Sequence, residues 1–302
     1  MHSLENKKEE YKKKCFFCSK IIEGNKSLEH IIPNSLLKKL NLKEKELSGN
    51  FPTQYSRLKV PAHSSCNSNF GSVYEDKIIR FLDNTDCLYE SIIRDDQLDI
   101  IYNPEYDSIS LITTWLSKIY YGLFYNDFLK TNDNEYRNSC YKIIKSKNFK
   151  LTQKSYQNNY GFNLPSSIYA FRTNKTTFNL ITLIYPSTIL LKISGLILIL
   201  CIADGYLTKN YLNSFNINSL NDYLEKNDEL DNFPTDLFAL AEITSLRQNI
   251  PKTPSFIFSD NKMINMSFST GVQNPEEYYK IDENAVINSR NKILASFGVQ
   301  LH

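Results

Sequence analysis

Two pairs of metal-binding residue types, each with two residues between its members, constrain the first quarter of this chain. Cys15 and Cys18 form one pair, and His63 and Cys66 form the other. Thiolate sulfur and imidazole nitrogen are ligands that zinc prefers, and two such pairs fill a tetrahedral site. A lone C-x2-C pair is a weak signal. Together the pairs predict one structural zinc ion, in a closed site that has no open position for a catalytic water or phosphate.

The few histidines of the chain gather around these pairs. Of the four histidines, two lie at the chain ends, and the interior two are His30 and His63. His30 directly follows Glu29 in the segment SLEHIIP, and Asn67 directly follows Cys66. A histidine packed in a core is the usual explanation for an isolated one. Here the adjacent carboxylate and the flanking metal pairs favour a chemical role for His30.

The order C-x2-C, EHIIP and H-x2-C-N, followed by Phe70-Gly71 and Glu75, resembles the HNH, or His-Me finger, endonucleases. The resemblance covers roughly residues 12–82, about a quarter of the chain. It implies a ββα-metal unit, in which a β-hairpin and a helix surround one catalytic divalent ion. The family hydrolyses nucleic-acid phosphodiester bonds.

The resemblance implies a role for three residues. His30 would be the general base, and a neutral imidazole with an ordinary pKa near 6.5 suits the removal of a proton from water. Glu29 and the side-chain carbonyl of Asn67 would bind the catalytic Mg²⁺ or Mn²⁺, since hard cations prefer oxygen ligands. Neighbouring residues of a strand point to opposite faces, so the family places this pair at a strand end.

Two positions depart from the family pattern. The second zinc pair begins with His63 where many relatives have cysteine, a substitution that zinc tolerates. The family's middle Asn, which orients the histidine base, falls where this chain reads Ser-Arg-Leu-Lys-Val, at 56–60. Asn50, Gln54 or a backbone carbonyl are the alternatives for orienting His30.

Length and composition predict a second domain. A chain of 302 residues exceeds the usual size of a single core, and its 41% hydrophobic and 13% aromatic residues are enough to build one. We expect residues 1–85 to form the HNH nuclease domain, where zinc replaces a core that so small a unit cannot build. We expect residues 86–302 to form an α+β domain with a mostly antiparallel sheet of four to six strands and several helices. Sensing, DNA positioning and oligomerisation are its candidate roles.

Apolar patterns predict the elements of that second domain. The run TILLKISGLILILCIA at 188–203 contains Lys192 and is shorter than the roughly 20 residues of a membrane helix, so it predicts two buried strands joined at Ser194-Gly195. A hairpin is predicted about Asp260-Asn261. Helical spacing predicts helices over residues 107–130, 233–248 and 276–297, and one over residues 75–82 that closes the first domain.

Charge and cysteine usage limit the class of protein. The net charge of +2 does not by itself identify a nucleic-acid binder. Cys87, Cys140 and Cys201 stand apart, unlike a secreted disulfide framework, and no secretion leader is evident. We therefore expect a cytoplasmic protein with no membrane partner.

The combined prediction is a metal-dependent endonuclease that hydrolyses DNA, with RNA left open as a substrate. A bacterial anti-phage or restriction system is its expected setting by analogy alone. A homo-oligomer or a partner protein, bound through residues 86–302, is left open as well. The alternative is a zinc-containing nucleic-acid-binding module without catalysis, although such a module has no need for Glu29, His30 and Asn67 together.

Overall fold

The computed structural model describes residues 4–49, 51–94, 108–157, 166–202, 233–249, 255–258, 264–267 and 282–299. Its contacts divide the chain into two compact units. Unit 1 comprises Met1–Asn84 and Asp99–Leu164, and unit 2 comprises Thr85–Leu98 and Pro165–His302. The predicted domains, divided after residue 85, differ from this grouping in one respect, because residues 99–164 group with the N-terminal segment.

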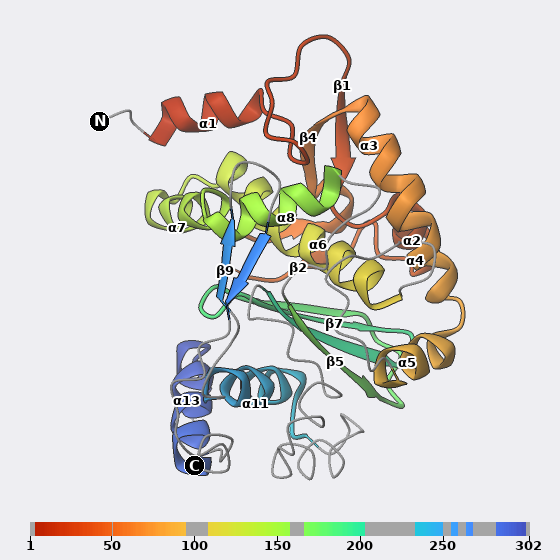
Figure 1. The fold of residues 1–302 in the computed structure, drawn as a ribbon, viewed down its shortest axis with the longest axis vertical. Helices are drawn as coiled ribbons and strands as arrows, with labels where there is room; N and C mark the ends of the chain where they lie inside the picture. The colour runs from red at the N-terminus through yellow and green to blue at the C-terminus, as the bar shows by residue number, and fades with distance from the viewer. Residues whose placement is uncertain are drawn as a thin grey trace. The chain divides into compact units, whose positions relative to one another are not determined.

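Unit 1 contains a two-stranded sheet followed by a helix. Strand β1 (Lys26–His30) pairs antiparallel with β4 (Lys59–His63), and α3 (Ser64–Phe70) follows β4 without a loop, as Figure 1 shows. A π-helical turn, η2 (Gly71–Glu75), continues α3 into α4 (Asp76–Phe81), where the sequence predicted a helix. The remaining N-terminal elements are α1 (Leu4–Lys12), α2 (Asn34–Lys39), β2 (Glu46–Leu47), β3 (Thr53–Gln54) and the 3-10 turn η1 (Tyr55–Arg57).

Three helices from beyond residue 107 complete unit 1. They are α6 (Ser108–Lys130), α7 (Asn134–Ile144) and α8 (Lys147–Gln157). Every residue of α6 from Leu111 to Phe128 is buried, which confirms the predicted long buried helix. A helix that is apolar all round must be covered on every side, and this one lies at the centre of its unit.

The core of unit 1 is aromatic and joins both chain segments. Phe16 and Phe17, which lie between the two N-terminal cysteines, are fully buried. The Phe16 ring centroid lies 5.6 Å from that of Tyr125 and 5.4 Å from that of Phe149, and Phe17 lies 5.8 Å from Tyr156. The expectation that a metal replaces the core of a small N-terminal domain was therefore wrong, because α6 and α8 supply a core.

Unit 2 is built on a four-stranded antiparallel sheet. Its strands are β5 (Ser167–Arg172), β6 (Asn179–Leu183), β7 (Thr188–Ile193) and β8 (Leu196–Cys201), in the order β5-β8-β7-β6. A separate hairpin pairs β9 (Ser255–Phe258) with β10 (Ile264–Ser267), as predicted, and its turn lies outside the described residues. The helices are α5 (Thr85–Arg94), α11 (Asp236–Asn249) and α13 (Glu283–Ser296). The α+β class with antiparallel sheets is confirmed.

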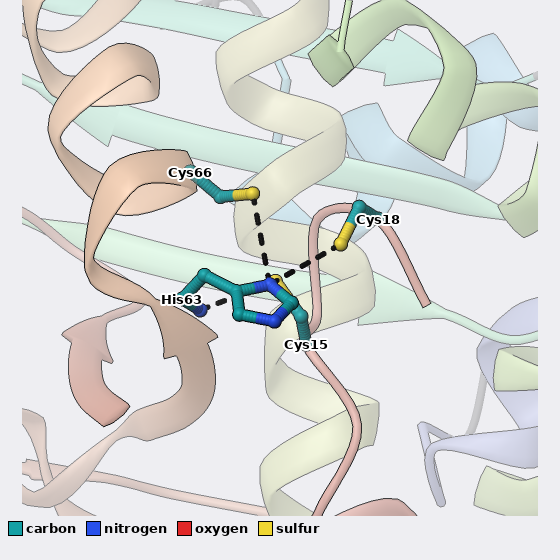
Figure 2. A group of neighbouring side chains, drawn as sticks. All are labelled: Cys15, Cys18, His63 and Cys66. Carbon is teal, nitrogen blue, oxygen red and sulfur yellow. Dashed lines mark hydrogen bonds between the residues drawn. The ribbon is translucent and has the colours of Figure 1, made fainter. Parts of the chain in front are cut away.

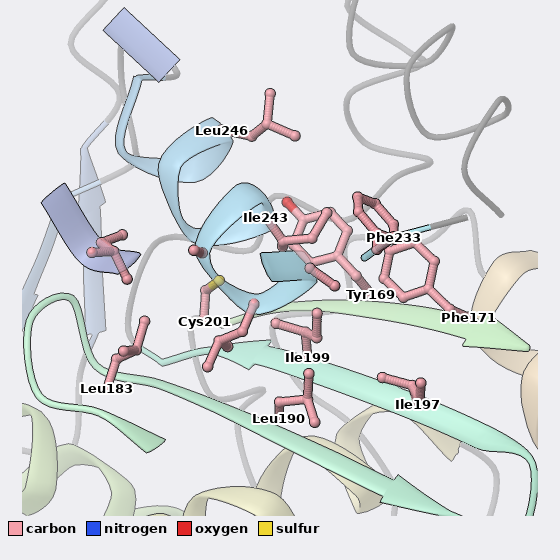
Figure 3. Packing of buried hydrophobic residues seen from close by; sticks show 14 of the residues in the cluster. Tyr169, Phe171, Leu183, Leu190, Ile197, Ile199, Cys201, Phe233, Ile243 and Leu246 are labelled. Carbon is pink, nitrogen blue, oxygen red and sulfur yellow. The ribbon is translucent and has the colours of Figure 1, made fainter. Parts of the chain in front are cut away.

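Helix α11 packs over one face of this sheet. Figure 3 shows Tyr169 and Phe171 of β5 and Ile199 of β8 on the side of the sheet toward Ile243 of the helix, and Leu246 belongs to the same buried cluster. Every position of β7 and β8 is buried, and central strands covered on both faces read as continuous apolar runs in a sequence. The prediction of two buried strands at 188–203 is confirmed. Among the described residues, no helix has the length and apolar character that a membrane crossing demands.

Lys192, the one charge within β7, is also accounted for. Its Nζ lies 3.0 and 3.1 Å from the two carboxylate oxygens of Asp236, at the start of α11. A buried ammonium needs such a partner, because an unpaired buried charge is strongly destabilising. The pair therefore joins the sheet to the helix that covers it.

The turn between β7 and β8 gives a testable prediction. Ser194 and Gly195 have φ angles of 50° and 80°, as a two-residue hairpin of type I′ requires. A Cβ on Gly195 would lie 3.3 Å from the carbonyl oxygen of Thr173. Gly195→Ala should lower the free energy of unfolding by about 1–2 kcal/mol, measured by urea denaturation followed by ellipticity. Ser194→Asn is the control and should be near neutral, since Asn tolerates this conformation; equal losses in both variants would contradict the explanation.

Candidate metal centre and the residues around it

The four predicted zinc ligands lie together. The ligand atoms of Cys15, Cys18, His63 and Cys66 are all within 4.8 Å of one another. His63 Nδ1 lies 3.4 Å from Cys18 Sγ and 3.9 Å from Cys66 Sγ, as Figure 2 shows. Ligand atoms about 2.3 Å from a tetrahedral ion lie roughly 3.8 Å apart, so these separations are close to the edges of such a site. The group can hold a metal ion.

Two short segments present these ligands. Cys15 and Cys18 flank a tight turn, in which the Ser19 N–H donates to the Cys15 carbonyl at 2.9 Å and Ser19 has a φ of 60°. His63 ends β4, and Cys66 lies in the first turn of α3. Residues three apart at a helix start lie on the same side, so the H-x2-C spacing directs both ligands toward the turn.

Hydrogen bonds around the group orient His63. Its Nε2 lies 3.2 Å from the Ile21 carbonyl oxygen, which fixes the tautomer that carries its proton on Nε2 and leaves Nδ1 facing the sulfurs. The His63 backbone N–H donates to Cys15 Sγ at 3.4 Å. Outer partners of this kind are typical of metal-binding histidines, and their presence here favours a metal site over a chance cluster.

The thiols of Cys18 and Cys66 do not ionise readily without a cation. Burial, together with the neighbouring Cys15 and Cys18, raises the pKa of the Cys66 thiol to about 12. Burial also raises the pKa of Cys18. Three sulfurs can share this space as thiolates only if a positive charge lies among them. The chemistry of the group therefore fits a bound divalent ion.

Helix α8 holds the cysteine turn through hydrogen bonds of Gln153. Gln153 donates from Nε2 to the Phe16 carbonyl at 2.6 Å and accepts from the Ser19 hydroxyl at 2.7 Å. The Phe16 N–H donates to the Pro61 carbonyl of β4 at 2.8 Å. These contacts connect the two ligand-bearing segments to each other and to α8, which the sequence did not reveal.

Glu29 and His30 are the last two residues of β1, and they face opposite ways. Glu29 is buried with 7% of its surface exposed, whereas His30 is half-buried. In the register with β4, Glu29 lies opposite Val60, and His30 lies opposite Lys59. Burial, with the positive charge of Lys59, lowers the pKa of the His30 imidazole. His30 is therefore neutral at neutral pH.

Asn67 lies on the Glu29 side of β1. Its Nδ2 donates to the Ser27 hydroxyl at 3.3 Å, and Ser27 and Glu29, two residues apart, share a face of the strand. Across the described ranges, His, Cys, Asp and Glu ligand atoms form no second group of three or more. The structure thus brings Asn67 to the face of Glu29 without a direct contact between them.

The residue that would orient His30 has no replacement among the described residues. Gln54, one alternative, donates instead to Glu44 at 3.2 Å. Asn50, the other, lies outside the described residues. Within the described ranges the His30 ring makes no hydrogen bond, so its direction follows from the backbone that carries it.

A buried lysine that the sequence analysis missed contacts Glu29. Lys118 of α6 is fully buried, and its Nζ lies 2.7 Å from Oε1 of both Glu29 and Glu75. Burial alone would lower the pKa of Lys118, but the carboxylates of Glu75 and Glu29 raise it, so the ammonium stays charged. Burial raises the pKa of Glu75. A lysine within the apolar stretch WLSKIYYG was the available signal, because a buried ammonium must have partners.

Further residues on the same face of α6 contact β4 and the residues next to the two strands. A Cβ at Gly122 would lie 3.0 Å from Ile31, so the missing side chain makes room for Ile31. The Lys59 N–H donates to Asn126 Oδ1 at 3.4 Å, and Lys130 Nζ donates to the Arg57 carbonyl at 2.5 Å. Together with Lys118 they recur every four residues, so they form one stripe along the helix.

Comparison with known proteins gives no name for this arrangement: the chain matches no family model, no curated protein and no solved structure. The chain's own residues provide a group able to hold a metal, a strand that ends in a carboxylate and an imidazole, and a helix packed beneath both.

Proposed function

We propose that this protein is a metal-dependent endonuclease of the HNH type that hydrolyses DNA phosphodiester bonds. One observation carries the proposal: a Cys3His group joins a cysteine turn to the β4–α3 junction, while the paired strand β1 ends in Glu29-His30. The order of hairpin and helix agrees with the ββα-metal unit that the motif resembles.

Zinc is the ion that we assign to Cys15, Cys18, His63 and Cys66. Three sulfurs and one nitrogen form a common structural zinc set, and the separations of 3.4 and 3.9 Å fit tetrahedral edges. All four positions come from the protein, so this ion has a structural role. It holds the end of β4 and the start of α3 against the cysteine turn.

His30 is the general base of the proposed reaction. Its imidazole is neutral, half-buried and at the end of β1, so it can accept a proton from an attacking water. Glu29 and Asn67 supply carboxylate and amide oxygens for a Mg²⁺ or Mn²⁺ ion, on the same side of β1. When bound, such an ion stabilises the negative charge that develops on the phosphate and the leaving oxygen.

The test is nicking of supercoiled plasmid by the purified full chain with Mg²⁺ or Mn²⁺. Wild type should convert the plasmid to the open circular form, and chelation of the divalent ion should stop it. Single-stranded DNA and RNA in parallel reactions identify the substrate. Equal cutting by wild type and His30→Ala would remove the assigned base.

A second candidate is a zinc-containing nucleic-acid-binding module without catalysis. The observation that favours it is the engagement of Glu29, whose buried carboxylate is already paired with Lys118. Under this alternative the chain binds DNA with the same affinity whether or not Mg²⁺ is present, and it cuts none. A gel-shift assay beside the nicking assay separates the two candidates. The anti-phage or restriction setting and the partner of residues 86–302 stay predictions.

A further inference from the structure

The ammonium of Lys118 is surrounded by oxygen. It lies 2.7 Å from Glu29 Oε1, 2.7 Å from Glu75 Oε1, 2.6 Å from the His30 carbonyl and 3.0 Å from the Ile31 carbonyl. An ammonium has three protons, so four oxygens use its full donor capacity. One carboxylate would be enough to neutralise the charge of the Lys118 ammonium. The other two acceptors are backbone carbonyls of two consecutive residues, His30 and Ile31.

Those contacts fix the end of β1. One nitrogen atom holds the Glu29 side chain and the carbonyls of the two residues that follow it. Gly122, one helical turn further along α6, admits the Ile31 side chain. Because no side chain among the described residues bonds the His30 ring, the direction of that ring depends on the backbone that Lys118 holds. Helix α6 thus holds the backbone that carries the His30 ring, although the hydrogen bonds of Lys118 do not reach the ring itself.

The same contact bears on cation binding by Glu29. A positive charge 2.7 Å from Oε1 weakens the attraction of this carboxylate for a second cation. Glu75 shares the ammonium, so the positive charge of Lys118 is divided between two carboxyl groups. Lys118 therefore reduces the affinity of Glu29 for a divalent ion while it holds Glu29 in one direction.

We propose that Lys118 is a positioning residue, which fixes Glu29 and His30 for the reaction and sets the affinity of Glu29 for the divalent ion. This inference rests on the proposed function. It differs from a purely structural ion cluster, which contributes to folding alone. Loss of a purely structural cluster reduces the amount of folded protein and leaves the cation affinity of the folded remainder unchanged.

The experiment compares wild type, Lys118→Met and Glu29→Gln as full-length, zinc-loaded chains. Binding of Mn²⁺ is measured by the electron paramagnetic resonance of the free ion, and plasmid nicking is measured at saturating Mn²⁺. Wild type should bind Mn²⁺ at a site that Glu29→Gln loses. Lys118→Met should bind it about fivefold more tightly or better, because a neighbouring positive charge is gone. Its nicking should be tenfold slower or more, because the reacting groups are displaced.

A matched control is Lys142→Met, which removes an exposed lysine from α7 in the same unit. It should leave both Mn²⁺ affinity and nicking unchanged. If Lys118→Met does not fold, because two buried carboxylates lose their cation, Lys118→Met with Glu75→Gln leaves only one carboxylate there. This double variant is then compared with Glu75→Gln alone. Failure of the double variant to fold as well would overturn the inference in favour of a folding role.

The remaining outcomes also decide whether Lys118 is a positioning residue. Unchanged Mn²⁺ affinity in folded Lys118→Met overturns the inference, and so does faster nicking, which would make Lys118 an inhibitory residue. If wild type binds Mn²⁺ through Glu29 but cuts nothing, the proposed function fails, and the affinity comparison still decides the effect of Lys118. If Glu29→Gln binds Mn²⁺ like wild type, Glu29 is not a ligand and the inference fails.

Discussion

Substitution of His30 by alanine is expected to slow plasmid nicking about 10²–10⁴-fold at saturating Mn²⁺. The change removes the only imidazole at the end of β1 and leaves the strand otherwise intact. His30 is half-buried, and its ring makes no hydrogen bond within the described residues, so little stability should be lost. Single-turnover rates with excess enzyme measure the effect on the chemical step.

Leu28→Ala provides the matched control for this variant. Leu28 lies two residues before His30 on the same face of β1, and 58% of its surface is exposed. It should cut within about twofold of wild type, since exposed substitutions have small effects. Added imidazole should restore part of the His30→Ala rate, because a free base can enter the space left by the side chain. A His30→Ala protein as fast as Leu28→Ala would contradict the role of His30.

Replacement of Cys66 by serine is expected to abolish stoichiometric zinc binding and to destabilise unit 1. A structural zinc contributes about 10–16 kcal/mol in small peptides, but the aromatic core around Phe16 and Phe17 should keep part of the fold. We expect a loss of roughly 3–5 kcal/mol, or about 10 °C in Tm for a unit of this size. Elemental analysis measures the zinc. Fluorescence of Trp115, the only tryptophan of the chain and buried in α6, reports unit 1.

Cys87→Ser is the control for that measurement. Cys87 is exposed on α5 and belongs to unit 2, so its loss should change neither the zinc content nor the Trp115 transition. Chelation of zinc from wild type should reproduce the Cys66→Ser transition. Full zinc content with an unchanged transition in Cys66→Ser would show that the four residues do not act as one metal site.

The parts of this protein that were predictable from its sequence depend on local patterns. The spacing of the two ligand pairs identified all four members of the Cys3His group, because each pair spans a single turn. Alternation of apolar runs and turn residues identified β7, β8 and the turn at Ser194-Gly195. Helical spacing identified α6, since its pattern extends over many residues.

The parts that could not be predicted depend on contacts between distant segments. Lys118 and Glu29 are 89 residues apart, and neither residue's neighbours indicate the other. The sequence predicted that α6 is a buried helix. It did not indicate that α6 packs with the N-terminal segment. The sequence therefore predicted the residues of the motif. It did not predict Lys118, which contacts Glu29, or Gln153, which contacts the cysteine turn.

The grouping of residues 99–164 with the N-terminal segment determines which truncated forms of the protein can be prepared. A shortened chain that stops near residue 85 retains the whole recognisable motif. It loses the residues of α6 and α8 that pack on Phe16, Phe17 and Ile31, and the only described cation beside Glu29 and Glu75. The shortened protein would expose the apolar surface that α6 and α8 cover in the full chain, and it should aggregate during purification. Expression of unit 1 should therefore retain the chain through at least residue 164.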